Sequence, residues 1–494
     1  MSRKSTPVIN FPMVFRVMGW LLLIEALFML VPLGVSLLCR EHDIALDFGV
    51  AMSVTACAGT FMAYVIKPKN HNTSMRKREG LLLTAIIWVF FSAFGMLPFI
   101  TSGTLTNVTD AFFETMAGFT TTGSTVIADV EALPRGLLFW RALMQWIGGM
   151  GIILFTLAVL PMLNYKGGIA LFNAEVTGIT HERMRPRVSQ TAKDMWLIYV
   201  VLTAVLALLL IVPMGWFDGV CHALTTMSTG GFTTHKDGLH YWHSYYIYVV
   251  VMVFMFLGGI NFSLLFAASR GRFNRVRQSD TFKWYCGVAF IVSLVIIGRM
   301  FYMNYCDNDA DRVTYAIFDT LSTITSTGFG SVHYEWGSEF VAMILLIMMF
   351  FGGMAGSTSG GAKIDRMIVL LKQTANEFYR VLHPNAVTTV RIDSRALPHV
   401  YVARVIAFLA IYFVVIFAVA LMLSMMGLPM FDSIFTSMST ISNVGLGYGV
   451  TADLGSLALL PAPAKWLLAI EMLVGRLELF TVLILFTRTF WVKD

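Results

Sequence analysis

Four short glycine-containing segments of this chain have the composition of loops that bind a cation through backbone carbonyl oxygens. They are Thr121-Thr122-Gly123, Ser228-Thr229-Gly230, Ser326-Thr327-Gly328 and Asn443-Val444-Gly445. Glycine reaches backbone conformations that a Cβ disfavours, which lets neighbouring carbonyls point the same way. Four such loops around one axis would replace the water shell of a cation with carbonyl dipoles. The alternative is four ordinary turns, but four copies at matching places favour a repeated ion-binding loop.

The sequence around these segments indicates how they are positioned. Each follows a short, Ser/Thr-rich amphipathic run that starts near an acidic residue. The four acids are Asp110, Asp218, Asp319 and Asp432. An acid in the first turn suits the N-terminus of a helix, whose free N–H groups favour negative charge. The runs are too short to cross a bilayer and lie between long apolar stretches, which predicts re-entrant pore helices and loops.

The composition of the chain is that of a polytopic membrane protein. Of 494 residues, 57% are hydrophobic and only 13% are charged, whereas soluble domains carry roughly 25% charged residues. Most Lys and Arg fall on one side of the predicted spans, which marks that side as cytoplasmic and places the N-terminus there. The net charge of +6 therefore reflects membrane topology and predicts no nucleic-acid partner.

We expect an all-α fold with four span–pore loop–span units around one pore, preceded by two extra transmembrane helices. The predicted divisions are residues 1–79 (two helices and a basic loop), 80–193, 194–280, 281–398 and 399–494 (one pore unit each). The first two spans are 11–38 and 44–66. The units contribute eight more: 81–100 and 137–163, 195–216 and 245–268, 282–303 and 339–372, and 401–426 and 464–491. Ten full spans leave no room for a soluble catalytic domain.

One predicted span is interrupted by a polar, glycine-rich stretch. It contains Gly352, Gly353, Gly356, Ser357, Thr358, Ser359, Gly360 and Gly361. Irregular backbone at membrane depth is tolerated where it is buried in protein or lines a watery cavity, so we expect a loop below the glycine segments. A glycine hinge or a small-residue packing face is the alternative. A phosphate loop is excluded because Ala362 separates Gly361 from Lys363 and no strand is predicted before it.

Arg476 lies within the last predicted span, where an arginine is costly and marks a functional site with a partner. A salt bridge to Glu471 or Glu478 on the same helix is the plain alternative. Their separations from Arg476, five and two residues, do not suit helical pairing. The carbonyl-rich loop at 352–361 is the favoured partner.

Together, the four single-glycine segments, the Gly-Gly-x-Ala-Gly-Ser-Thr interruption and Gly475-Arg476 resemble the TrkH/TrkG/KtrB superfamily of potassium transporters. The two leading spans are similar to the TrkH and TrkG branch. This resemblance implies potassium as the transported ion, with Gly123, Gly230, Gly328 and Gly445 in the selectivity filter. It implies a gating loop at 352–361 with Arg476 as its partner. It also implies a homodimer gated by a cytoplasmic, TrkA-like ring protein that binds ATP/ADP or NAD(H).

We therefore expect a gated, channel-like potassium uptake protein of the bacterial inner membrane, in contact with membrane lipid and without an organic cofactor on this chain. A proton- or sodium-coupled secondary cation transporter is the alternative. No nucleophile–base pair or metal cluster suggests an enzyme. The basic segments 183–193, 270–283 and 380–395 are the predicted docking face for the ring protein, although topology signalling would explain their charge equally well.

Overall fold

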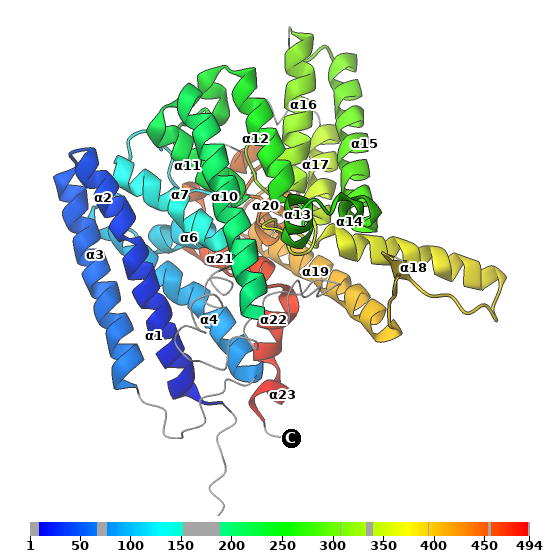
Figure 1. Cartoon of the computed structure of the whole chain (residues 1–494), viewed down its shortest axis with the longest axis horizontal. Coiled ribbons are helices and arrows are strands. Elements are labelled where there is room, and N and C mark those ends of the chain that lie inside the picture. Colours follow the sequence, from blue (N-terminus) through cyan, green and yellow to red (C-terminus); the bar gives the residue numbers. More distant parts are fainter. Residues whose placement is uncertain are drawn as a thin grey trace, which may run out of the picture.

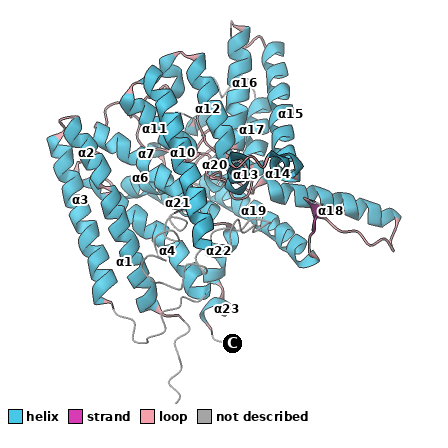
Figure 2. Ribbon diagram, viewed as in Figure 1, coloured by secondary structure: helices cyan, strands magenta, loops and turns pink. Residues whose placement is uncertain are grey.

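Helices make up nearly all of the computed structural model (Figures 1 and 2). The structure describes residues 9–66, 77–151, 188–306, 308–331, 339–393, 395–452 and 456–492. Within these ranges the only strands are the two-residue β1 (Arg391–Ile392) and β2 (Arg395–Ala396), an antiparallel pair in which Arg391 lies opposite Ala396. The expectation of an all-α fold is confirmed to the extent that the described chain is mostly helical.

Six of the described helical segments are long and apolar enough to cross a membrane. They are α1 (Phe11–Phe28) with α2 (Leu30–Leu38), α3 (His42–Thr60) with its π-helical end Phe61–Val65, α4 (Lys77–Gly95) with α5 (Leu97–Thr101), α10 (Val188–Met214), α15 (Asp280–Tyr302) and α19 (His399–Met425). In Figure 1, α1 and α3 lie side by side at one edge of the molecule. These lengths and compositions make the chain a multi-pass membrane protein.

Four shorter helices lie in the interior. They are α6 (Val108–Phe119), α11 (Trp216–Met227), α16 (Asp309–Ile324) and α20 (Met430–Ile441). Most residues of α6, α11 and α20 are buried, and so is the C-terminal half of α16. A 12-residue helix such as α6 is about 18 Å long, well short of the roughly 30 Å hydrocarbon core. Asn107 caps α6 and Asn308 caps α16, each accepting a backbone N–H through its side chain.

The acid of the third run is not where the sequence suggested. Asp309 and Asp311 occupy the first turn of α16, and Asp319 lies well inside the helix. Its carboxylate accepts hydrogen bonds from Ser331 N at 3.1 Å and Ser331 Oγ at 2.7 Å. Asp319 therefore braces the segment that follows the helix, while Asp110, Asp218 and Asp432 lie in first turns as expected.

The helices that follow these four short helices are all shorter than predicted. They are α7 (Arg135–Gly149), α12 (Tyr245–Gly258), α17 (Glu339–Phe351) and α21 (Ala462–Arg476). The chain turns by 107° between α12 and α13 (Phe262–Ser269), and Glu478, at φ +59°, separates α21 from α22 (Leu479–Leu483). The predicted spans 245–268 and 464–491 are therefore each interrupted, and neither is a single continuous helix. The part of 137–163 beyond residue 151 lies outside the described residues.

The remaining elements lie mainly at the ends of the bundle. They are α14 (Phe273–Gln278), α18 (Ile364–Leu382), α23 (Arg488–Trp491) and the 3₁₀ turns Gly238–Trp242, Gly449–Thr451, Ser456–Leu459 and Ile484–Phe486. Helix α18 begins beneath the bundle and extends away from it (Figure 1). Its N-terminal turn is buried and its C-terminal part is exposed. This arrangement leaves α14, α18 and the β1–β2 hairpin on one surface.

Candidate cation-binding site

The chain leaves each of the four short helices through the same hairpin. In every copy a backbone N–H donates to the carbonyl five residues earlier. The four bonds are Thr122 N to Ala117 O (2.9 Å), Gly230 N to Thr225 O (2.9 Å), Thr327 N to Ser322 O (2.8 Å) and Val444 N to Ser439 O (2.9 Å). The preceding residue is left-handed each time: Thr121, Thr229, Ser326 and Asn443 have φ between +52° and +54°. The following residue is a left-handed glycine: Gly123, Gly231, Gly328 or Gly445.

This pattern corrects the register predicted for the second segment. The sequence aligned Gly230 with Gly123, but Gly231 has the positive φ (+78°) and Gly230 does not. The equivalent triplet is Thr229-Gly230-Gly231, so Ser228 is the residue that directly follows α11. Two adjacent glycines made either alignment possible from the sequence. The number of residues after the helix could have identified Gly231 as the equivalent glycine, because each left-handed glycine comes four residues after the last residue of its helix.

The four loops meet one another in a closed circuit. A Cβ built on Gly123 would overlap Gly230 O of the next loop, and one on Gly231 would overlap Thr327 O. In the same way Gly328 faces Val444 O, and Gly445 faces Thr122 O in the first loop. Each glycine thus lies against the carbonyl of the residue that precedes the next glycine. Only glycine fits, because of both the close approach and the positive φ.

Side chains of the loops bind to protein groups around this circuit. Asn443 Nδ2 donates to Thr122 Oγ1 at 2.9 Å and to Met472 O at 3.0 Å, which joins the fourth loop to the first. Ser442 Oγ shares a 2.8 Å hydrogen bond with the hydroxyl of Tyr412. These side chains fix the loops, and backbone carbonyls are the groups in such loops that suit a dehydrated cation. Within the described residues no group of His, Cys, Asp and Glu could hold a metal ion.

The predicted interruption between α17 and α18 is present, and it lies against the ends of the short helices. Gly352, Gly356 and Gly361 have φ of +64°, +79° and +76°. The segment's other predicted residues also contribute contacts: Gly353 N donates to Ser359 Oγ at 3.0 Å, and Ser357 Oγ lies 3.0 Å from Ser359 Oγ.

Two residues of this segment contact the hairpins directly. Gly360 N donates to Ser326 Oγ at 2.5 Å, and a Cβ on Gly360 would overlap Ser442 O. Thr358 Oγ1 donates to Gly258 O at 3.1 Å and to Met227 O at 3.3 Å. The segment is therefore packed beneath at least three of the four loops.

Arg476 contacts this segment, as the sequence predicted. Its Nη1 donates to Thr358 O at 2.9 Å, and its Nη2 donates to Gly148 O at 2.6 Å and to Gly149 O at 2.9 Å. The two bonds to the end of α7 were not foreseen. Glu471 instead accepts hydrogen bonds of 2.6 Å from Ser437 and Thr440, and Glu478 pairs with Arg366. The arginine thus joins the interruption to the C-terminal end of α7.

Lys465 is a buried cation that sequence reasoning missed. It is 5% exposed, and its Nζ lies 2.5 Å from Asp110 Oδ1 and 2.8 Å from Ala458 O. The pair joins α21 to the first turn of α6. A lysine at the second position of the predicted apolar span 464–491 was the available signal, since such a residue needs a partner.

Four glycine hairpins inside a bundle of membrane helices, each glycine packed against a backbone carbonyl of the next hairpin, define the class of multi-pass membrane transport proteins. Comparisons with known proteins agree. The family model TrkH, described as cation transport protein, matches residues 51–287 and 288–491. The chain is 35% identical over 489 residues to the Trk system potassium uptake protein TrkH of Salmonella typhimurium, covering 98% of this chain and 99% of that protein. It is 32% identical over 478 residues to TrkG of Escherichia coli, covering 96% and 97%.

A solved structure is similar over the same extent. The crystal structure of the potassium transporter TrkH from Vibrio parahaemolyticus superposes with a TM-score of 0.87 at 34% identity, covering 98% of this chain and all of that chain. The protein belongs to the TrkH family of cation transport proteins.

Proposed function

We propose that this protein takes up potassium across the bacterial inner membrane through a gated, channel-like pore. Four span–pore loop–span units surround that pore, and two further helices precede them. The observation that carries the proposal is the closed circuit of glycine hairpins, in which each left-handed glycine lies against a backbone carbonyl of the next hairpin. Potassium follows from the names of the relatives and from the suitability of carbonyl rings for that ion. The filter comprises the four left-handed glycines and the two residues before each.

Uptake of this kind requires no coupled reaction. An inside-negative potential contributes roughly 2.3 kcal/mol per 100 mV for each monovalent cation. Because each factor of ten in concentration corresponds to about 1.4 kcal/mol, a passive pore supports roughly 50-fold accumulation per 100 mV. The segment 352–361, held by Arg476, acts as the gate. A homodimer and a cytoplasmic ring protein that binds ATP/ADP or NAD(H) complete the proposed system.

Flux through the purified protein distinguishes this pore from a coupled transporter. In liposomes with a potassium gradient, we expect a cation current that reverses at the potassium Nernst potential at any proton or sodium gradient. A reversal potential that moves with the proton gradient at constant potassium, or potassium driven against its electrochemical gradient by a sodium gradient, would instead establish the coupled secondary transporter. Absence of potassium flux, with correctly inserted protein, would refute the proposal.

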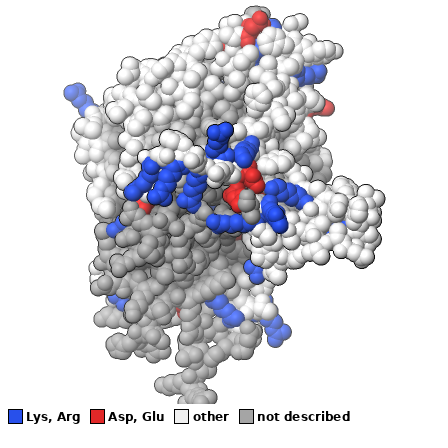
Figure 3. Space-filling model, turned by 45° about the vertical axis from the view of Figure 1, so that its right-hand side comes forward, with Lys and Arg blue, Asp and Glu red and all other residues white. Residues whose placement is uncertain are grey.

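A basic surface supports the proposed docking of a ring protein. Figure 3 shows Lys and Arg gathered in a band across one face. The exposed basic residues of α14, the start of α15 and the β1–β2 hairpin are Arg272, Arg277, Lys283, Arg391 and Arg395. The hairpin is fixed to α15: Asp280 N donates to Asp393 Oδ1 at 2.7 Å, and Asp393 N donates to Asp280 Oδ2 at 3.2 Å. Predicted segments 270–283 and 380–395 therefore form one surface, whereas 183–187 lie outside the described residues.

Charge reversal on this surface tests the docking. Replacing Arg272, Arg277, Arg391 and Arg395 together with glutamate reverses four of the five positive charges on this surface, and all four side chains are exposed. We expect co-purification with the ring protein to be lost, because complementary charge is replaced by repulsion. Accessibility labelling of both termini serves as the control for unchanged membrane orientation. Intact binding by the fourfold variant would assign these charges to topology alone.

A further inference from the structure

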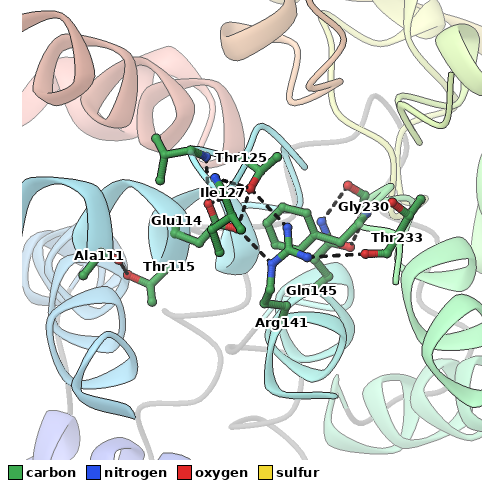
Figure 4. A network of polar contacts seen from close by, with 11 residues as sticks. Ala111, Glu114, Thr115, Thr125, Ile127, Arg141, Gln145, Gly230 and Thr233 are labelled. Atoms are coloured by element: carbon green, nitrogen blue, oxygen red, sulfur yellow. Dashed lines mark hydrogen bonds and ion pairs between the residues drawn. The ribbon is translucent and has the colours of Figure 1, made fainter. Parts of the chain in front are cut away.

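Two polar side chains of α7 are buried behind the second hairpin. Gln145 is fully buried and Arg141 is 2% exposed. Because they are four residues apart, they lie on the same face of the helix. Gln145 Nε2 donates to Gly230 O at 2.6 Å, and Gln145 Oε1 accepts from Phe232 N at 3.1 Å (Figure 4). A single side chain thus binds the residue on each side of Gly231.

Arg141 joins the first hairpin to the second. Its Nε donates to Glu114 Oε1 at 2.9 Å, its Nη2 to Thr125 Oγ1 at 3.2 Å and its Nη1 to Thr233 O at 3.4 Å (Figure 4). The guanidinium carbon also lies 4.0 Å from the centre of the Phe232 ring. Glu114 is fully buried, so each charge neutralises the other. The arginine therefore sets the spacing between the segments that leave the two hairpins.

The other three repeats have apolar side chains at the equivalent positions. The helices align on Gly148, Gly258, Gly352 and Gly475. Built Cβ atoms on Gly148 and Gly475 would overlap Phe119 O and Ile441 O, the ends of α6 and α20, and one on Gly258 would lie 3.6 Å from Met227 O at the end of α11. Three residues before these glycines are Gln145, Met255, Met349 and Met472; seven before are Arg141, Val251, Leu345 and Leu468.

All of these residues are buried. Apolar side chains therefore meet the packing requirement in three repeats. Packing does not require the polar pair Gln145 and Arg141 in the first repeat. Burying two polar side chains is unfavourable unless they make hydrogen bonds. The bonds of this pair are directed at the second hairpin. The glutamine binds a carbonyl of the circuit itself, a bond that methionine cannot donate.

We propose that Gln145, with Arg141 anchoring the adjoining residues, is a positioning residue that determines the specificity of the filter for potassium over sodium. This inference rests on the proposed function. A smaller ion binds well only when the ring of oxygens contracts around it, and selectivity depends on how freely the carbonyls move. Because Gly230 and Phe232 are both bound to Gln145, the second hairpin cannot follow such a contraction. The second hairpin therefore cannot move inward to bind a sodium ion.

The test is the substitution Gln145→Met, which introduces the side chain present in the other three repeats. It keeps the helix face filled and removes both hydrogen bonds to the hairpin. In proteoliposomes with potassium on one side and sodium on the other, we expect the permeability ratio to fall by about tenfold, while potassium current persists. The matched control is Met255→Leu, a nearly volume-conserving change in the second repeat, for which the ratio remains that of the unaltered protein.

Each outcome is decisive. A folded Gln145→Met protein with an unchanged permeability ratio overturns the inference. If that variant does not purify as a monodisperse species, Arg141→Lys replaces it. The lysine retains the charge beside Glu114 but cannot also reach Thr233 O and Thr125, so the ratio should again fall, and an unchanged ratio overturns the inference. Absence of potassium current in the unaltered protein would instead refute the proposed function.

Discussion

Replacing Gly328 with alanine is expected to reduce potassium flux by about 100-fold or more. Gly328 has φ +77°, and a Cβ there would overlap Val444 O. The strained conformation alone costs about 1–3 kcal/mol. The overlap also displaces one of the facing carbonyls, so the ion loses a ligand in addition. Tracer uptake into proteoliposomes measures the effect, with the yield of membrane-inserted protein and elution as a monodisperse species as checks of folding.

A control substitution at another left-handed glycine distinguishes the effect of backbone strain from the effect of disrupting the contacts between the hairpins. Gly103 has φ +70°, but a Cβ there meets no atom within 4 Å. Gly103→Ala should therefore leave flux nearly unchanged. The second repeat tests the register: Gly231→Ala should be as severe as Gly328→Ala, and more severe than Gly230→Ala, whose nearest neighbours would be side-chain atoms of Gln145 and not backbone. If the Gly328→Ala variant has the same flux as the wild-type protein, these loops do not line the ion pathway.

The second large effect is expected when the proposed gate is released. Arg476 holds the segment 352–361 through Thr358 O and holds α7 through Gly148 O and Gly149 O. Arg476→Ala removes all three hydrogen bonds, each worth about 1 kcal/mol or more. The balance of a two-state segment should then shift by about tenfold or more toward the open form. We expect higher cation flux in the absence of the ring protein.

A deletion provides independent evidence on the same gate. Removing part of 356–361 takes away the backbone beneath the hairpins, including Gly360, whose N–H binds Ser326 Oγ. Basal flux should rise in this variant too, and Arg380→Ala, on the exposed part of α18, serves as a control in which flux stays at the basal level. A well-folded deletion that conducts no faster than the intact protein would make the segment a hinge and place the gate elsewhere.

The sequence predicted those features that depend on local composition. The glycine segments, the helices before them and the interruption at 352–361 all follow from residue types within short windows. The break after Gly258 was missed because two glycines and an asparagine hardly lower the mean hydropathy of a long apolar run. The register of Gly231 was missed because adjacent glycines are equivalent in composition.

The features that the sequence did not predict depend mainly on contacts between segments that are far apart in the chain. Gln145 and Gly230 are 85 residues apart, and no periodicity in the sequence relates them. We predicted a partner for Arg476 because a charged side chain within a membrane needs one. The predicted partner, the segment 352–361, contains Thr358, whose carbonyl Arg476 binds. The additional bonds to Gly148 and Gly149 depend on how α21 packs against α7, which composition alone does not determine.

All four hairpins of the circuit belong to one polypeptide. Their number is therefore set when the chain is synthesised, and dilution cannot separate them as it would the subunits of a tetramer. A mutation at one hairpin changes a single quarter of the ring, whereas in a tetramer of identical subunits it would change every quarter. Each quarter can consequently diverge by itself, which is why a glutamine can stand behind one hairpin while methionine stands behind the other three.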